Sequence, residues 1–233
     1  MPNPLAAPRF AAAIFDLDGT LVDSLADIAA AMNWALARHG LPTHPEAAYR
    51  GFVGEGVREL VRRSAGLATA EGPQHARLLE SYRAYYAEHL LDRTRPFPGI
   101  APLLERLAAG GVRLGVLSNK SDAFTRQLVQ ALFPGHAFGA VYGERPGVAR
   151  KPDPSAALAL AAELGVAPGA CAFVGDTPVD MKTARAAGMH AVGVTWGFRG
   201  TEELSAHGAQ ALARGADELW RALQAAPAPA SSR

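Results

Sequence analysis

Short apolar segments and amphipathic segments alternate along the chain after residue 97, and this alternation limits the possible folds more than any other feature. Glycines such as Gly165 and Gly188 mark the ends of helical segments. Strands are expected at residues 112–117, 140–142, 172–174 and 191–194, and helices at residues 122–132, 155–164, 179–187 and 218–223. Such alternation predicts an α/β fold in which a parallel sheet carries helices on both faces.

Residues 22–95 differ because no strand-like run interrupts them. Apolar residues recur there at helical spacing in three stretches: Leu25, Ile28, Met32 and Leu36; Val57, Leu60 and Val61; and Leu79, Tyr82, Tyr86 and Leu90. Ser24 is expected to cap the first helix and Gly40 to end it. Prolines and a glycine at residues 95–99 indicate a hinge. We therefore expect an all-helical domain at residues 22–95, inserted after the first strand of a core made of residues 1–21 and 96–233.

The first strand is expected within residues 11–24, where an apolar run stops at two aspartates, Asp16 and Asp18. Gly19 and Thr20 follow, where the chain must turn. Side chains alternate along a strand, so the two carboxylates point to the same side if the strand geometry continues that far. In open α/β sheets this edge binds ligands. Two neighbouring carboxylates repel each other, so the pair requires a cation, a proton or both.

Three more polar clusters follow expected strands. They are Ser118-Asn119-Lys120, Lys151-Pro152-Asp153-Pro154, and the segment that runs from Gly175-Asp176 to Asp180. Because the carboxyl ends of parallel strands share one edge of the sheet, these clusters are expected to meet Asp16 and Asp18 there. Two unit charges about 4 Å apart cost about 4 kcal/mol at an effective dielectric near 20, so gathered aspartates require a counter-ion.

These motifs offer oxygen ligands, and neither histidine nor cysteine is among them. Such a donor set selects a hard cation, and Mg²⁺ is the first choice. Lys151 adds a second positive charge, and Ser118 adds a hydroxyl donor. A carboxylate nucleophile, a second acid, a divalent cation, a lysine and a hydroxyl together suit phosphoryl transfer, in which catalysis consists mainly of positioning and charge neutralisation.

Composition excludes several other classes. A formal net charge of +1 gives no electrostatic reason to expect nucleic acid or an anionic membrane as a partner. Cys171 is the only cysteine, so no intramolecular disulfide can form. The N-terminus lacks the pattern of a signal peptide, and no uncharged apolar run is long enough to span a bilayer, so a soluble cytoplasmic protein is expected. Residues 225–233 are low in complexity and are expected to be disordered.

The order of the motifs resembles that of the haloacid dehalogenase (HAD) superfamily, specifically its Mg²⁺-dependent phosphatases with a helical cap after the first strand. The motifs are Asp16-Leu17-Asp18-Gly19-Thr20, then Ser118, then Lys151, then Gly175-Asp176 with Asp180. One such motif is weak support, whereas four in order within a suitable structural context are strong support. The resemblance covers residues 11–198 and implies a Rossmann-like core with an all-α cap.

The resemblance also implies roles for the acidic residues. Asp16 attacks phosphorus and forms an aspartyl-phosphate, and Asp18 protonates the leaving alcohol and then activates water. To hold a proton near neutral pH, Asp18 needs a pKa that neighbouring carboxylates raise. Asp16, the backbone carbonyl of Asp18 and Asp176 bind Mg²⁺, whereas Asp180 supports the metal shell or orients Lys151.

Contacts with the substrate are expected from the same motifs. Ser118 donates a hydrogen bond to the transferred phosphoryl group, and Lys151 neutralises its charge. The expected substrate-binding residues from these motifs are Gly19, Thr20 and Asn119. For Asn119 and Lys120, however, a solvated turn is as good an interpretation as a ligand.

A glycine-rich loop at residues 49–58 interrupts the helical segment. In relatives with this cap, the matching loop faces the catalytic edge and contacts the part of the substrate that is not phosphate. Arg50 or Arg58 could therefore bind a second anionic group of the substrate. The alternative for either residue is an ordinary solvated arginine.

Several residues discriminate among the activities of this superfamily. Dehalogenases lack the second acid, which here is Asp18, and phosphonate-cleaving relatives use a cap lysine, whereas residues 22–95 contain none. Phosphomutases with this cap usually carry valine at the position of Thr20. A non-catalytic binding module would be expected to have lost Asp16, Asp18 or Lys151, and none is lost. A phosphatase is therefore the favoured activity.

Substrate preference follows from two segments. Ser118-Asn119-Lys120 and residues 192–198 (VGVTWGF) look most like the phosphoglycolate phosphatase branch. Hydrolysis of 2-phosphoglycolate to glycolate and phosphate is therefore the first expectation. Another small substrate, either a sugar phosphate or pyrophosphate, is the alternative. We expect a monomer or a homodimer that binds a small phosphorylated substrate.

Overall fold

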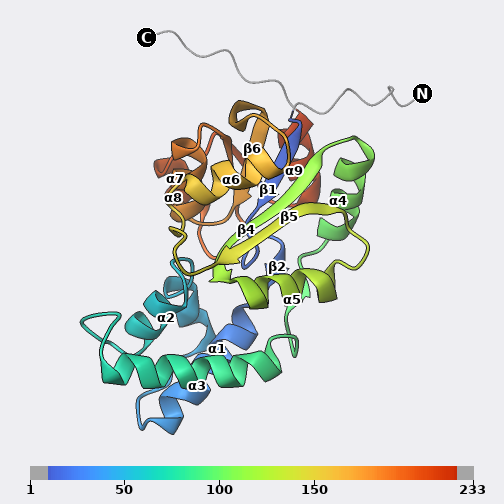
Figure 1. Cartoon of the computed structure of the whole chain (residues 1–233). Coiled ribbons are helices and arrows are strands. Elements are labelled where there is room, and N and C mark those ends of the chain that lie inside the picture. The colour runs from blue at the N-terminus through green and yellow to red at the C-terminus, as the bar shows by residue number, and fades with distance from the viewer. Residues whose placement is uncertain (1–9, 225–233) are drawn as a thin grey trace.

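The computed structural model of the chain describes residues 10–224, so the expected disorder of residues 225–233 concerns residues outside this description. Six parallel strands form the main sheet in the order β5-β4-β1-β6-β7-β8 (Figure 1). Their bounds are β1 Ala12–Phe15, β4 Arg113–Ser121, β5 Phe138–Glu144, β6 Cys171–Gly175, β7 His190–Val194 and β8 Ala211–Ala213. The predicted α/β fold with a parallel sheet is confirmed.

The central strand β1 supplies side chains to two hydrophobic cores. Ala13 and Phe15 belong to the core that includes α4 (Ile100–Ala109), α5 (Asp122–Leu132) and α9 (Ala216–Gln224). Ala12 and Ile14 belong to the core on the opposite face, which includes α6 (Ser155–Glu163), α7 (Pro178–Ala186) and α8 (Thr201–Ala206). Because alternate side chains of one strand are buried on both faces, β1 reads in the sequence as a continuous apolar run.

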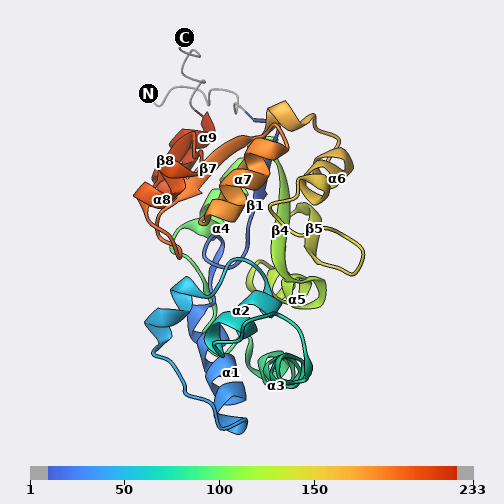
Figure 2. The same ribbon diagram turned by 90° about the vertical axis from the view of Figure 1, so that its left-hand side faces the viewer.

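A separate group of helices lies between two short strands, β2 (Val22–Asp23) and β3 (Arg95–Pro96). This helical unit contains α1 (Leu25–Arg38), the 3₁₀ helix η1 (Glu46–Gly51), α2 (Val57–Ser64) and α3 (Pro73–His89). In both views it lies beyond the C-terminal ends of β4 and β5 (Figures 1 and 2). Domain boundaries at residues 22 and 95 stay a prediction.

Some expected details of these elements are wrong. The expectation that residues 22–95 contain no strand is wrong at both ends, where the short strands β2 and β3 pair antiparallel. Strands of two residues carry no periodicity and cannot be found from the pattern. The strand expected at residues 112–117 continues to Ser121, which pairs with Glu144 beyond a register irregularity. Ser24 occupies the N-cap position of α1, but its side chain makes no capping hydrogen bond.

Other elements differ in smaller ways. The helix α5 has the predicted bounds, whereas α4, α8 and β8 are not predicted from the sequence. The helix α8 and the strand β8 are too short for a clear repeat of apolar positions. Within residues 10–224, no helix has the length and hydrophobicity that a membrane crossing requires.

Candidate active site

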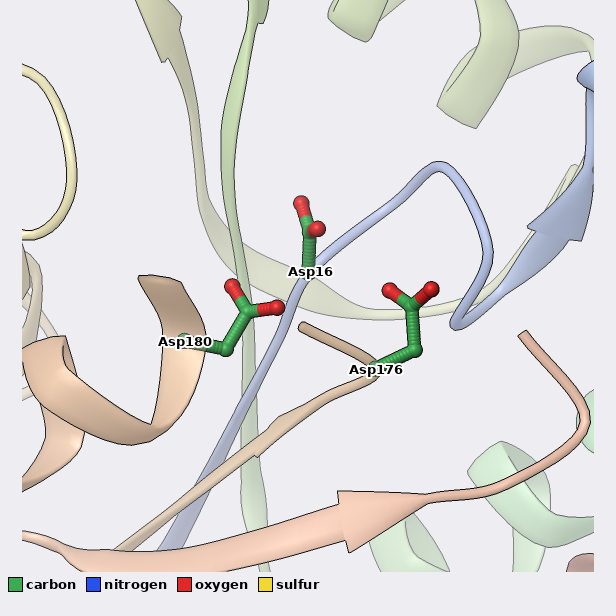
Figure 3. A group of neighbouring side chains, drawn as sticks. All are labelled: Asp16, Asp176 and Asp180. Atoms are coloured by element: carbon green, nitrogen blue, oxygen red, sulfur yellow. The ribbon is translucent and has the colours of Figure 1, made fainter. Parts of the chain in front are cut away.

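The C-terminal ends of the central strands bring three aspartates together. Asp16 directly follows β1, Asp176 directly follows β6, and Asp180 lies in the first turn of α7. One carboxylate oxygen from each lies within 4.8 Å of the other two, and all three residues are buried. Figure 3 shows the three carboxylates gathered at the ends of these segments. The topology of a parallel sheet thus concentrates negative charge at one edge.

Lys151 places a positive charge inside this group. It lies between β5 and α6, and its side chain is 1% exposed. Its Nζ donates a hydrogen bond to Oδ1 of Asp180 at 2.7 Å. It also lies 2.9 Å from Oδ1 of Asp16, although that contact lacks hydrogen-bond geometry. Oδ2 of Asp180 accepts hydrogen bonds from the backbone N–H and the hydroxyl of Thr177, which fixes the carboxylate that orients Lys151.

Burial and charge shift the pKa values in this group. Burial raises the pKa of Asp16 from 3.8 to about 6, and the ammonium of Lys151 limits the rise. Burial also raises the pKa of Asp176 well above its ordinary value, and the charges of Asp180 and Asp16 raise it further. Burial would lower the pKa of Lys151, but the carboxylates of Asp16 and Asp180 raise it above the ordinary value. One lysine does not balance three buried carboxylates, so the site requires more positive charge.

These residues fit a hard divalent cation. The clustered donors are all carboxylate oxygens, which is the ligand type that Mg²⁺ prefers. Oδ1 of Asp16 is buried and accepts no hydrogen bond from any residue that the structure describes. The metal ligand expected from Asp18 is its backbone carbonyl, and its side chain is not in this group.

The turn after Asp18 supports Asp176. The hydroxyl of Thr20 donates to Oδ1 of Asp176 at 3.1 Å, and the backbone N–H of Phe198 donates to Oδ2 at 2.7 Å. Gly19 has φ of +82°, and a β-carbon there would lie 2.3 Å from Oδ2 of Asp176. The sequence predicts substrate contacts for Gly19 and Thr20, and the structure places both against Asp176.

The carboxylate of Asp18 binds a different lysine. Nζ of Lys120 lies 2.9 Å from both of its oxygens, and the hydroxyl of Ser24 donates to Oδ1 at 2.5 Å. The charged side chain in direct contact with Asp18 is therefore an ammonium group rather than a carboxylate. From the sequence alone, a solvated turn residue and a ligand are equally good interpretations of Lys120. Its only available signal was that lysines are rare, since the chain has only Lys120, Lys151 and Lys182.

Ser118 and Asn119 lie near the end of β4. The hydroxyl oxygen of Ser118, a buried residue, accepts a hydrogen bond from the backbone N–H of Lys120 at 3.3 Å. The side chain of Asn119 donates to the backbone carbonyl of Lys151 at 3.1 Å and accepts from its N–H at 3.0 Å. It also donates to the carbonyl of Gly54 in the helical unit at 3.3 Å. Asn119 thus holds the backbone of Lys151 and connects it to the helical unit.

A cavity of about 60 Å³, here called the Asp16 cavity, lies between the sheet edge and the helical unit. Its polar lining comes from Asp16, Asp18, Arg83, Asn119, Lys120 and Ser121. Its remaining lining comes from Ile28, Val53, Gly54, Gly56, Val57, Leu60, Tyr82, Tyr86 and Phe124. The nucleophile predicted from the sequence therefore faces a small space whose far wall is mostly apolar.

The two arginines of the glycine-rich loop have other partners. Arg50 donates to the backbone carbonyl of Gly197 at 2.6 Å, and Arg58 donates to that of Ala70 at 2.6 Å. Neither arginine is among the residues that line the Asp16 cavity. A substrate contact by either one would require the guanidinium to leave its present partner. Their predicted role stays a prediction.

Comparisons with known proteins identify the family to which the chain is similar. The chain matches the family model for haloacid dehalogenase-like hydrolases over residues 13–194. It is 40% identical over 194 residues to a phosphoglycolate phosphatase of Rhodospirillum rubrum, with 80% of each chain covered. It is 35% identical over 208 residues to the phosphoglycolate phosphatase of Yersinia pseudotuberculosis, covering 88% of this chain and 90% of that one. A solved structure from Lactobacillus delbrueckii, described as a candidate phosphoglycolate phosphatase, has a TM-score of 0.86 at 34% identity, covering 94% of this chain and 100% of that chain.

Proposed function

The chain belongs to the haloacid dehalogenase-like hydrolases, and from this premise we propose that it is a Mg²⁺-dependent phosphatase that hydrolyses 2-phosphoglycolate to glycolate and phosphate. Its relatives in the comparison are phosphoglycolate phosphatases, and the chain is a phosphoric monoester hydrolase. One observation carries the mechanism: Asp16 lines a cavity while its carboxylate lies beside Lys151 and within 4.8 Å of carboxylate oxygens of Asp176 and Asp180.

Asp16 and Asp176 are the side chains that we propose to hold Mg²⁺, with the backbone carbonyl of Asp18 and with support from Asp180. When bound, the ion supplies positive charge that neutralises the carboxylates and the phosphoryl oxygens. The raised pKa values of Asp16 and Asp176 support this assignment, because both groups are destabilised as anions by burial.

In the first half-reaction, an oxygen of Asp16 forms a bond to phosphorus while the bond from phosphorus to the leaving oxygen breaks. Asp18 gives a proton to that leaving oxygen, so glycolate departs as the alcohol. Lys151 lies beside Asp16 and neutralises the transferred group, and Ser118 donates a hydrogen bond to it. These residues would catalyse the step by positioning the phosphoryl group and by stabilising its negative charge during transfer.

In the second half-reaction, water attacks phosphorus and gives its proton to Asp18. The bond between Asp16 and phosphorus breaks, and phosphate leaves. Lys120 contacts both oxygens of Asp18 and so holds in place the carboxylate that accepts this proton. Lys120 therefore belongs to the proposed machinery as a positioning residue.

The size of the Asp16 cavity favours a small substrate. Its volume is only about 60 Å³, so a bulky alcohol would need the helical unit to move. Sugar phosphates and pyrophosphate remain the alternative substrates. We also propose the cytoplasm as the compartment and a monomer or homodimer as the assembly.

Purified protein assayed against a panel of phosphate esters tests this proposal. We expect phosphate release from 2-phosphoglycolate that needs added Mg²⁺ and stops with a chelator. Asp16→Asn should lower turnover by about 10³-fold or more, because the nucleophile is lost. Unchanged activity in that variant, or activity that survives chelation, would contradict the mechanism. A higher kcat/KM for a sugar phosphate or pyrophosphate than for 2-phosphoglycolate would show that the proposed substrate is wrong. The proposed reaction class would still hold.

A further inference from the structure

One cation that lines the Asp16 cavity has no partner among residues 10–224. The cationic residues of the lining are Lys120 and Arg83, and Lys120 pairs with Asp18. Arg83 lies on α3, is exposed, and makes no hydrogen bond or ion pair with any residue in the part of the chain that the structure describes. An unpaired guanidinium at the wall of a small cavity is suited to an anionic ligand, because it offers several N–H donors in a fixed plane.

The position of Arg83 matches the leaving-group side of the proposed reaction. Asp18 gives its proton to the leaving oxygen, so the alcohol must lie next to Asp18. Lys120 contacts Asp18 and lies 4.7 Å from the ring of Tyr86, measured to the ring centre. Arg83 precedes Tyr86 by three positions on the same helix, so the two side chains are neighbours on one face. A short alcohol that extends from phosphorus past Asp18 would therefore reach this part of α3.

The hydroxyl of Tyr86 independently indicates that this part of the cavity binds a polar ligand. Its side chain lines the Asp16 cavity, and its buried hydroxyl has no hydrogen-bond partner among the described residues. A buried hydroxyl without a partner costs free energy, and such groups in native structures are normally satisfied. Burial, with the charges of Asp18 and Asp27, raises the pKa of Tyr86 well above its ordinary value, so the hydroxyl keeps its proton and can donate.

We propose that Arg83, with the hydroxyl of Tyr86 beside it, binds an anionic group on the leaving alcohol and so selects small phosphate monoesters whose alcohol carries a carboxylate. This inference rests on the proposed function and deepens it. It assigns the specificity contact to α3 rather than to the glycine-rich loop, whose Arg50 and Arg58 bind backbone carbonyls and do not line the cavity.

The test compares 2-phosphoglycolate with 2-phosphoglycolamide, in which a neutral amide replaces the carboxylate at nearly the same size. Arg83→Ala should lower kcat/KM for 2-phosphoglycolate by about 10- to 100-fold more than for the amide, because a charge-assisted contact is lost. Arg83→Lys should recover part of this difference, and Tyr86→Phe should show a smaller selective loss of about 5-fold. Calorimetric titration of 2-phosphoglycolate into Asp16→Asn protein, with and without Arg83→Ala, should show the same loss in affinity without turnover.

Arg77→Ala is the matched control, since Arg77 is exposed on the same helix and is not among the residues that line the cavity. It should change kcat/KM for neither ester. Equal losses on both esters in Arg83→Ala would overturn the inference, as would a selective loss confined to Arg50→Ala or Arg58→Ala. If the unmodified protein hydrolyses both esters and Arg83→Ala shows no selective loss, the inference alone fails. If it hydrolyses neither ester, the proposed function fails and the inference fails with it.

Discussion

The ammonium of Lys120 lies 2.9 Å from both carboxylate oxygens of Asp18, although the two residues are 102 positions apart in the sequence. The pair is largely buried, with side-chain exposures of 8% for Lys120 and 11% for Asp18. A second contact, from the hydroxyl of Ser24, fixes the same carboxylate from the start of α1. The proposed acid and base is thus held in place by residues from the sheet edge and from the beginning of the helical unit.

Removal of the Lys120 side chain should therefore slow the reaction more than it weakens substrate binding. We expect Lys120→Ala to lower kcat by about 10- to 100-fold, because a general acid and base contributes only when it is correctly placed. Lys120→Arg should restore part of the rate because it keeps a cation next to Asp18. Lys182→Ala, a change at an exposed lysine on α7, is the control and should keep the normal rate. Steady-state kinetics with an aryl phosphate would measure these rates, and an unchanged kcat in Lys120→Ala would refute the positioning role.

The sequence allowed the convergence of Asp16, Asp176, Asp180 and Lys151 to be predicted for a simple reason. Each of these residues follows a strand or opens the next helix, and parallel strands place such positions at one edge. The prediction needed topology and did not need side-chain conformations. The same reasoning applies to the α/β fold, which follows from the alternation of apolar and amphipathic segments.

The positions of the Lys120, Ser24 and Arg83 side chains could not be predicted in this way. Ser24 has the usual features of a helix cap, yet its hydroxyl binds Asp18 because the turn brings that carboxylate within 2.5 Å. Arg83 and Arg77 both occupy exposed positions on α3, and only the packing of α3 over the sheet edge distinguishes them. Such differences depend on the tertiary placement of side chains, which local pattern does not encode.

The buried carboxylates make the stability of the metal-free protein depend on pH. The pKa of Asp16 is raised from 3.8 to about 6, so over this range the folded protein holds a proton that the unfolded chain has released. The contribution of Asp16 to stability is therefore present at low pH and is lost as pH rises from about 4 through about 6. The raised pKa of Asp176 acts in the same direction.

Urea denaturation in the presence of a chelator would measure this effect at several pH values. Asp16→Asn should remove part of the decline in the free energy of unfolding between pH 4 and pH 7, since asparagine does not ionise. Added Mg²⁺ should stabilise the protein more at pH 7.5 than at pH 5, because the ligands are then anionic. A decline of equal size in Asp16→Asn would show that Asp16 is not responsible.

Gly19 should tolerate no side chain. Its φ of +82° is unfavourable for alanine, and a β-carbon would lie 2.3 Å from Oδ2 of Asp176 and 2.8 Å from the ring of Phe198. We expect Gly19→Ala to lower the free energy of unfolding by about 3 kcal/mol and to weaken Mg²⁺ binding, because Asp176 must move. Gly40→Ala separates the effect of the positive φ from that of the clash with Asp176. Gly40 also has a positive φ, of +68°, but nothing lies within 4 Å of its β-carbon position. It should cost only about 1 kcal/mol and leave Mg²⁺ affinity unchanged, as measured by denaturation and calorimetry.

Asn119 should affect catalysis through Lys151 rather than through substrate binding. Its side-chain amide accepts from the N–H of Lys151 and donates to the carbonyl of the same residue, so it fixes the backbone that carries the ammonium. Asn119→Ala should lower kcat by about 10- to 100-fold with little change in KM, because the charge beside Asp16 is displaced. Asn119→Asp keeps the oxygen that accepts from the N–H of Lys151 and loses both N–H donors. Its rate should therefore lie between those of the unmodified protein and Asn119→Ala.

A contact with Gly54 adds a second consequence. Because the Asn119 amide also donates to the carbonyl of Gly54, its loss should loosen the helical unit over the cavity. Hydrogen exchange of the backbone around Gly54 should therefore quicken in both Asn119 variants, since both lose this donor. If KM rises while kcat is unchanged, Asn119 contacts the substrate directly, as its position in the cavity lining would also permit.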